Sequence, residues 1–200
     1  MLAPILGGLL LGGSLIVAIG AQNAFVIRQG IIGRHVFWIC AFCAACDAIL
    51  IVVGVAGLGA VIKAMPGFLG LMTYGGAAYL SWHGFNALRR VFRPAAMSAA
   101  NEFALPLRQA LLTCAGFTLL NPHVYLDTVL LIGSIANARP AGEQWSFAFG
   151  ACLASVLWFY GIGFGALAMR RWLARPAVWR AIDATIAIIM FVLAGRLVLG

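Results

Sequence analysis

Apolar residues in this chain fall into runs that are long enough to cross a lipid bilayer. A helix needs about 20 apolar residues to cross the roughly 30 Å of hydrocarbon in a membrane. Runs of about this length lie at 5–27, 36–60, 67–88, 110–135, 147–169 and 182–199. Their length, and the lack of a period of two along them, favour helices over the strands of a barrel. The pattern therefore predicts an all-α integral membrane protein with six transmembrane helices.

The run at 5–27 is predicted to be a retained membrane span. No basic residue precedes it, and it is longer than the apolar core of a signal peptide. The alternative is that this run does not cross the membrane completely. The chain would then have five spans, with its amino terminus inside.

The basic residues predict which connections face the cytoplasm. Ten of them lie in the first, third and fifth connections: Arg28, Arg34, Arg89, Arg90, Arg93, Arg108, Arg170, Arg171, Arg175 and Arg180. The other three are Lys63, Arg139 and Arg196. Because cytoplasmic connections carry an excess of Lys and Arg, we expect the odd-numbered connections inside the cell and both termini outside.

The longest connection, residues 89–109, divides the chain into two sets of three spans. It contains Pro94 and Pro106 and four of the basic residues. Three is an odd number, so two similar halves, 1–88 and 110–199, would have opposite orientations in the membrane. Inverted repeats of this kind are a recurring architecture of transporters, with the substrate site between the halves. We therefore expect one transporter domain, built from two inverted three-helix repeats and a basic cytoplasmic linker.

The composition supports a membrane protein and argues against several other classes. Apolar residues make up 64% of the chain and charged residues 9%, and the mean hydropathy is +1.04. A soluble domain of this size could not bury so much apolar surface. The net charge of +8 is explained by the basic connections rather than by nucleic-acid binding, because no basic cluster is interleaved with aromatic residues.

The residues that carry most enzymatic chemistry do not occur here in recognisable patterns. We find no nucleophile with a matching base, no glycine-rich phosphate loop and no zinc spacing, so we predict that the chain is not an enzyme and has no cofactor. Cys40, Cys43 and Cys46 repeat every three residues, which resembles a metal-binding run but lacks a fourth ligand. We interpret them as small packing residues on one side of a helix; a membrane thiol or metal protein is the alternative.

The stretch Asn121 to Asp127, "NPHVYLD", interrupts the fourth apolar run. Pro122 has no amide hydrogen and its ring crowds the preceding turn, so a helix from Ala110 should break there. Proline is also favoured as the first residue of a helix, and asparagine is favoured as its N-cap. The sequence therefore predicts two half-helices in this span, the second with exposed amides and a positive dipole end that suit an anionic group.

Two acidic residues lie inside apolar runs. Asp127 is about one and a half turns into the second half-helix, and Asp47 is near the middle of the second span. A lone carboxylate at this depth costs several kcal/mol unless it is paired or hydrated, so both should face a cavity. Together they predict a pocket that accepts a cation beside a helix end that accepts an anion. An α-amino acid with a basic side chain carries both groups.

Other polar residues within the spans have a structural as well as a functional interpretation. Gln22 and Asn23, in "GAQN" late in the first span, either line the substrate site or join helices through hydrogen bonds. His123 is a candidate proton relay or a hydrogen-bonded packing residue. Tyr125 either lines the cavity or belongs to an interfacial aromatic belt.

Several features near the ends of spans are interpreted without a functional role. Arg196 and Asp183 are expected to extend to the membrane interface. The pairs Gly8/Gly12 and Gly161/Gly165 permit close helix contact, although such spacings are common in apolar runs.

At these residues the chain resembles the lysine and arginine exporter family (LysE/ArgO), and its arginine branch in particular. The matching stretches are "GLLLGGSLIVAIGAQNAFVIRQGI", "CDAILI", "YGGAAYLSWHGFNALR" and "LLNPHVYLDT", and the similarity extends over nearly the whole chain. By position, the resemblance assigns Gln22 and Asn23 to the first motif of the family and Asp47 to the acid of its second span. It assigns 121–127, with Asn121, Pro122 and Asp127, to the motif of its fourth span. The family usually has proline where this chain has Ala21, and alanine permits an unbroken helix in the first span.

The resemblance implies an exporter of basic L-amino acids in the bacterial inner membrane, driven by the electrochemical gradient. The expected partners are arginine or lysine, a proton or the membrane potential, the lipid bilayer and, in a homodimer, a second copy of the chain. A passive small-solute channel and an exporter of a neutral amino acid are the alternatives. The two acidic residues are the argument from this sequence for a cationic substrate.

Overall fold

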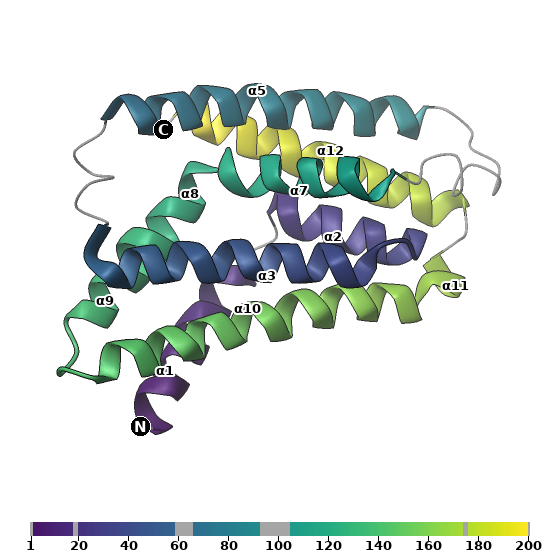
Figure 1. The fold of residues 1–200 in the computed structure, drawn as a ribbon. Coiled ribbons are helices and arrows are strands. Elements are labelled where there is room, and N and C mark those ends of the chain that lie inside the picture. Colours follow the sequence, from purple (N-terminus) through teal and green to yellow (C-terminus); the bar gives the residue numbers. More distant parts are fainter. Residues whose placement is uncertain (1, 18–19, 59–65, 93–104, 174–175, 200) are drawn as a thin grey trace.

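The computed structural model describes residues 2–17, 20–58, 66–92, 105–173 and 176–199, and all the elements in these ranges are helices (Figure 1). The prediction of an all-α chain is confirmed for them. In chain order the helices are α1 (Leu2–Ile16), α2 (Ala21–Ile32), α3 (Val36–Val53), η1 (Gly54–Leu58), α5 (Pro66–Val91), α7 (Leu107–Leu119), α8 (Pro122–Val124), η2 (Tyr125–Ile132), α9 (Gly133–Asn137), α10 (Glu143–Ala168), α11 (Arg170–Leu173) and α12 (Pro176–Leu199). Lys63, Arg93, Pro94, Arg175 and the middle of the predicted linker lie outside the described residues.

Three of the predicted spans correspond to single long helices. By length and composition Val36–Gly57, Glu143–Ala168 and Arg180–Leu199 could each cross a membrane. Two further spans would each be a pair of helices that meets at a sharp bend, α1 with α2 at 84° and α7 with Pro122–Asn137 at 66°. The third predicted span corresponds to α5, which has 26 residues but is less apolar than α3, α10 and α12. The chain has the architecture of a multi-pass membrane protein, and the number of six spans stays a prediction.

The basic residues gather toward one end of the molecule. Figure 1 shows the carboxyl ends of α2 and α5, the start of α7 and the short helix α11 at the same end, on the right. These segments carry Arg28, Arg89, Arg108, Arg170 and Arg171. The arrangement is the one expected if this end faces the cytoplasm.

Helices that are far apart in the sequence pack against one another in pairs. α1 lies against α10, α5 lies against α12, and α3 packs on α10. The pairs α3 with α10 and α5 with α12 join equivalent helices of the two halves, and the first span of each half is bent. An inverted repeat would produce these same pairings, and the repeat itself stays a prediction.

Glycines bring α1 and α10 into close contact. A Cβ at Gly8 would collide with the backbone of Phe147, and one at Gly12 would lie 3.1 Å from the Cα of Ala151. Lipid is as apolar as a leucine side chain, so helices in membranes associate through this kind of close packing. The second glycine pair is different, because a Cβ at Gly161 or Gly165 would meet nothing within 4 Å.

Replacing Gly8 by alanine is expected to destabilise the fold, because the added methyl group cannot fit against Phe147. Overpacking of a tight contact lowers the free energy of unfolding by about 1–3 kcal/mol, which thermal unfolding in detergent would record as a lower melting temperature. Gly13→Ala is the matched control, since a Cβ at Gly13 meets nothing within 4 Å. Equal melting temperatures for the two variants would contradict this account of the α1–α10 contact.

Candidate functional site

The fourth span breaks where the sequence predicts. α7 ends at Leu119 and a new helix begins at Pro122, with a bend of 66° between their axes. Asn121 is the N-cap of the new helix, and its Oδ1 accepts a hydrogen bond from the amide of His123 at 3.1 Å. Proline occupies the first helical position, where its missing amide hydrogen leaves no bond unmade. The predicted break and cap are confirmed.

The first amides of this half-helix already have hydrogen-bond partners, whereas the sequence predicted amides left for a ligand. Besides the bond from His123 to the Asn121 side chain, the amide of Val124 donates to the Asn121 carbonyl at 3.2 Å and that of Tyr125 to Pro122. The tight turn at the cap supplies these carbonyl partners locally. An anion near this helix start would therefore interact with its dipole rather than with free amides.

The first span is also broken, although it has Ala21 where the family has proline. α1 and α2 meet at 84°, and Gly20, just before α2, has an extended backbone with φ −100° and ψ 179°. This conformation ends a helix whatever the next residue is. Alanine at position 21 would permit an unbroken helix, but the first span is broken in the structure.

One polar side chain spans each break. Asn23 donates from Nδ2 to the carbonyl of Ile16 at 2.9 Å, and the hydroxyl of Tyr125 donates to the carbonyl of Leu119 at 2.8 Å. Both carbonyls belong to the last turn of the helix before a break, where no intrahelical amide is left to satisfy them. The Oδ1 of Asn23 also accepts from Nε1 of Trp158 at 3.3 Å. Asn23 and Tyr125 thus fix the geometry of the two bends.

Asp47 is buried in the middle of α3. Its residue is 6% exposed, and its Oδ2 accepts a hydrogen bond of 2.8 Å from the hydroxyl of Ser155 on α10. A carboxylate away from bulk water needs such partners. The bond joins the second span of one half to the second span of the other.

A cavity of about 590 Å³ lies between the two breaks. Its wall includes six of the eight predicted site residues, drawn from both halves of the chain: Gln22, Asn23, Asp47, Asn121, His123 and Asp127. Pro122 and Tyr125 are not on this wall, and their described contacts are those of the helix break. The volume is within the range of sites for small molecules, roughly 300–1,000 Å³.

One of the two interface assignments made from sequence is wrong. Arg196 is exposed in the last turn of α12 and also lines the large cavity, so its assignment to the interface stays a prediction. Asp183 is only 6% exposed, and its Oδ1 lies 3.6 Å from Nε of Arg28. The position of Asp183 along its helix does not show which way its side chain faces. Its ion-pair partner, Arg28, lies 155 positions away in the sequence, so the pair could not be predicted.

Three residues at this site were not predicted from the sequence: Ser155, Tyr79 and Phe117. Ser155 is a hydroxyl in an otherwise apolar run and holds Asp47, whereas Tyr79 and Phe117 contribute rings to the wall of the cavity. A lone serine within an apolar span was the one usable signal. The two aromatic residues are indistinguishable by sequence from those that face lipid.

The cysteines occupy packing positions. Cys40 and Cys43 are buried, with the thiol of Cys40 donating to the carbonyl of Phe159 at 3.1 Å and Cys43 lying 3.0 Å from Cys114 between sulfur atoms. The interpretation as packing residues is confirmed for these two, whereas Cys46 is half-buried and its role stays a prediction. Within the described ranges no group of three or more His, Cys, Asp or Glu side chains could hold a metal ion.

Known proteins are similar to this chain over almost its whole length. The model of the LysE type translocator family matches residues 13–200. A putative amino-acid transporter, YggA, of Aeromonas salmonicida is 42% identical over 100% of this chain and 98% of its own length. The arginine exporter protein ArgO of Yersinia enterocolitica is 39% identical over 98% and 97%, and the lysine exporter LysE of Corynebacterium diphtheriae is 35% identical over 97% and 98%. No solved structure matches the chain.

Replacing Tyr125 by phenylalanine is expected to destabilise the protein, because the carbonyl of Leu119 loses its donor inside the membrane. A buried acceptor left without a partner costs about 1–3 kcal/mol. Thermal unfolding in detergent measures the change. Tyr74→Phe removes the same hydroxyl from a residue that is 69% exposed and serves as the control; equal stabilities would show that the bond across the bend contributes nothing.

Proposed function

The chain belongs to the family of LysE type translocators, and we propose that it exports basic L-amino acids, arginine or lysine, across the bacterial inner membrane. Two of its relatives are named as exporters of these amino acids, and the similarity covers almost the whole length of each. The observation that carries the proposal is that Asp47 and Asp127 line the same cavity.

The charges of the cavity suit a cationic amino acid. Asp47 and Asp127 come from different spans, so the cavity presents carboxylates on two walls. A guanidinium or ammonium group offsets the unfavourable free energy of keeping carboxylates away from water. Arg196 and the dipole of the helix that begins at Pro122 provide an opposite charge for the substrate carboxylate.

The predicted site residues then divide into two groups. Asp47 and Asp127 bind the cationic side chain or exchange protons, and Gln22, Asn121 and His123 provide the other polar contacts. A second group fixes the two bends that shape the cavity: Asn23, Pro122 and Tyr125.

Export of a cation requires an energy source. Moving one positive charge outward against an inside-negative potential costs about 2.3 kcal/mol for every 100 mV. Inward movement of one proton for each substrate would cancel this charge transfer. A carboxylate that binds the substrate cation in one step and a proton in the next would couple the two movements, and both acidic residues have this chemistry. We therefore propose proton exchange as the driving reaction.

Asp47→Asn and Asp127→Asn are expected to reduce export of labelled arginine by at least about tenfold, because the amide keeps the shape but cannot pair with a cation. Initial rates in proteoliposomes measure the effect. Glu143→Gln is the matched control, since Glu143 lies in the first turn of α10 and is not on the cavity wall. Unchanged rates in both aspartate variants, with normal insertion, would refute the proposed site.

Proteoliposomes containing the purified protein are expected to accumulate arginine or lysine against a concentration gradient when a pH gradient is imposed. A protonophore should abolish the accumulation, because dissipating the proton gradient removes the driving force. A passive channel would only equilibrate the substrate. Accumulation of leucine in place of both basic amino acids would favour the exporter of a neutral amino acid.

A further inference from the structure

A second, smaller cavity lies toward the end of the molecule where the basic segments gather. Its volume is about 330 Å³, and its polar lining consists of Arg28, His83, Asn86, Arg89 and Thr113. Arg28 lies late in α2 and Arg89 late in α5, the two helices whose carboxyl ends lie together in Figure 1. If this end faces the cytoplasm, the small cavity lies on the side from which an exported molecule enters.

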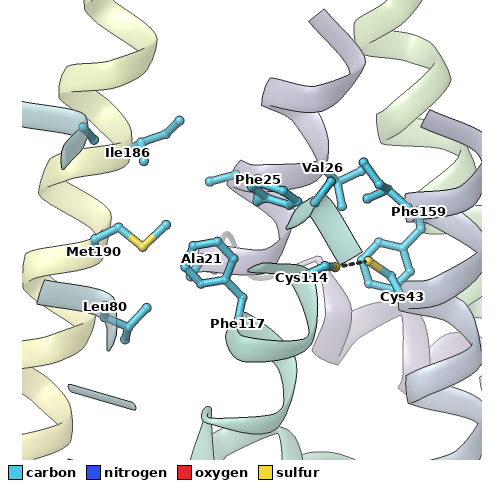
Figure 2. Close-up of a cluster of buried hydrophobic side chains, with 14 of the residues drawn as sticks. Ala21, Phe25, Val26, Cys43, Leu80, Cys114, Phe117, Phe159, Ile186 and Met190 are labelled. Carbon is cyan, nitrogen blue, oxygen red and sulfur yellow. Dashed lines mark hydrogen bonds between the residues drawn. The ribbon is translucent and has the colours of Figure 1, made fainter. Parts of the chain in front are cut away.

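The ring of Phe117 separates the small cavity from the large one. Phe117 lines both cavities, although its residue is only 3% exposed. Its ring centroid lies 5.6 Å from that of Phe25, 5.2 Å from Tyr79 and 4.7 Å from His83. The rings of Phe117, Phe25, Tyr79 and His83 form an aromatic layer. Figure 2 shows two of them, Phe25 and Phe117, on the side of α12 that carries Met190. Phe117 is thus the one residue that the two cavities have in common among the described residues.

Tyr79 holds this layer in place from α5. Its hydroxyl donates to the carbonyl of Thr113 at 2.9 Å, one turn before Phe117 in α7. A Cβ at Gly116 would collide with the ring of Tyr79, so the glycine next to Phe117 is what lets the two helices approach. The closed layer therefore depends on contacts between α5 and α7.

The small cavity carries positive charge. Arg28 and Arg89 line it, and no carboxylate is among the described residues of its wall. Asp183 lies beside Arg28, with 3.6 Å between Oδ1 and Nε, and holds that guanidinium in position. Guanidinium groups bind carboxylates with strong, directional hydrogen bonds. A cation without a carboxylate can make no such bond there.

We infer that the small cavity is a second binding site for the amino acid, which takes it by its carboxylate before Phe117 moves aside to admit it to the large cavity. The inference rests on the proposed function. It divides recognition between the two cavities, with the carboxylate bound first by Arg28 and Arg89 and the cationic side chain bound afterwards by Asp47 and Asp127. Alternating access in transporters requires such a closed point between the two sides.

The first test measures arginine uptake into everted vesicles, whose cytoplasmic face is outside. Arg89→Gln should raise KM for L-arginine by about tenfold with kcat within about twofold, because a charge-assisted bond to the carboxylate is lost. Arg171→Gln removes the same charge from an exposed residue at the same end and should leave both values unchanged. Arginine uptake with an unchanged KM in Arg89→Gln overturns the inference while the proposed function stands.

The second test uses protection of single cysteines in the full-length protein, after its five native cysteines are replaced and transport is verified. Leu105→Cys reports on the small cavity and Leu15→Cys on the large one. L-Arginine should slow the reaction of Leu105→Cys with a maleimide, and agmatine, which lacks the carboxylate, should not. The inference is overturned if arginine protects only Leu15→Cys, or if agmatine protects Leu105→Cys as well as arginine does. If arginine protects neither cysteine, the result counts against the proposed function as well.

Discussion

Inside a membrane the carbonyl groups at a broken helix must find donors within the protein, and this constraint shapes the whole molecule. Lipid offers no hydrogen bonds, so a helix end in the hydrocarbon region is stable only where side chains or local turns satisfy it. Here Asn23 and Tyr125 reach back to the helix that precedes each bend, and Asn121 caps the helix that follows the second. These three side chains stabilise the bends, and the large cavity is lined by residues on either side of them.

The same arrangement connects structure with transport. The large cavity lies beside the two bends, and residues from all six predicted spans line it. Burial of Asp47 with a single described hydrogen-bond donor, Ser155, leaves a carboxylate that still has capacity to bind a cation. The aromatic layer at Phe117 lies between this space and the smaller cavity toward the basic end of the molecule.

Local features of the site could be predicted from sequence, whereas features that depend on side-chain direction could not. Proline after asparagine identifies a break and its cap, because both act within one turn. The break before Ala21 carries no proline and follows from the extended backbone at Gly20. Pairing of Asp47 with Ser155, and of Asp183 with Arg28, joins residues more than 100 positions apart. A single sequence holds no record of such contacts, so the burial of Asp183 could not be predicted from it.

Asp127 lies in η2, a stretch of π-helix in which hydrogen bonds run from each carbonyl to the fifth residue beyond it. Such a stretch holds a surplus residue compared with an α-helix of the same length. The position of this extra residue can shift along the chain. Each residue that the shift passes then turns by about 100° around the helix axis, which is the rotation per residue of an α-helix. The direction of the Asp127 carboxylate is thus linked to helical register as well as to its own rotamer. A shift of register past Asp127 would therefore turn this carboxylate around the helix axis without any change of its side-chain torsions.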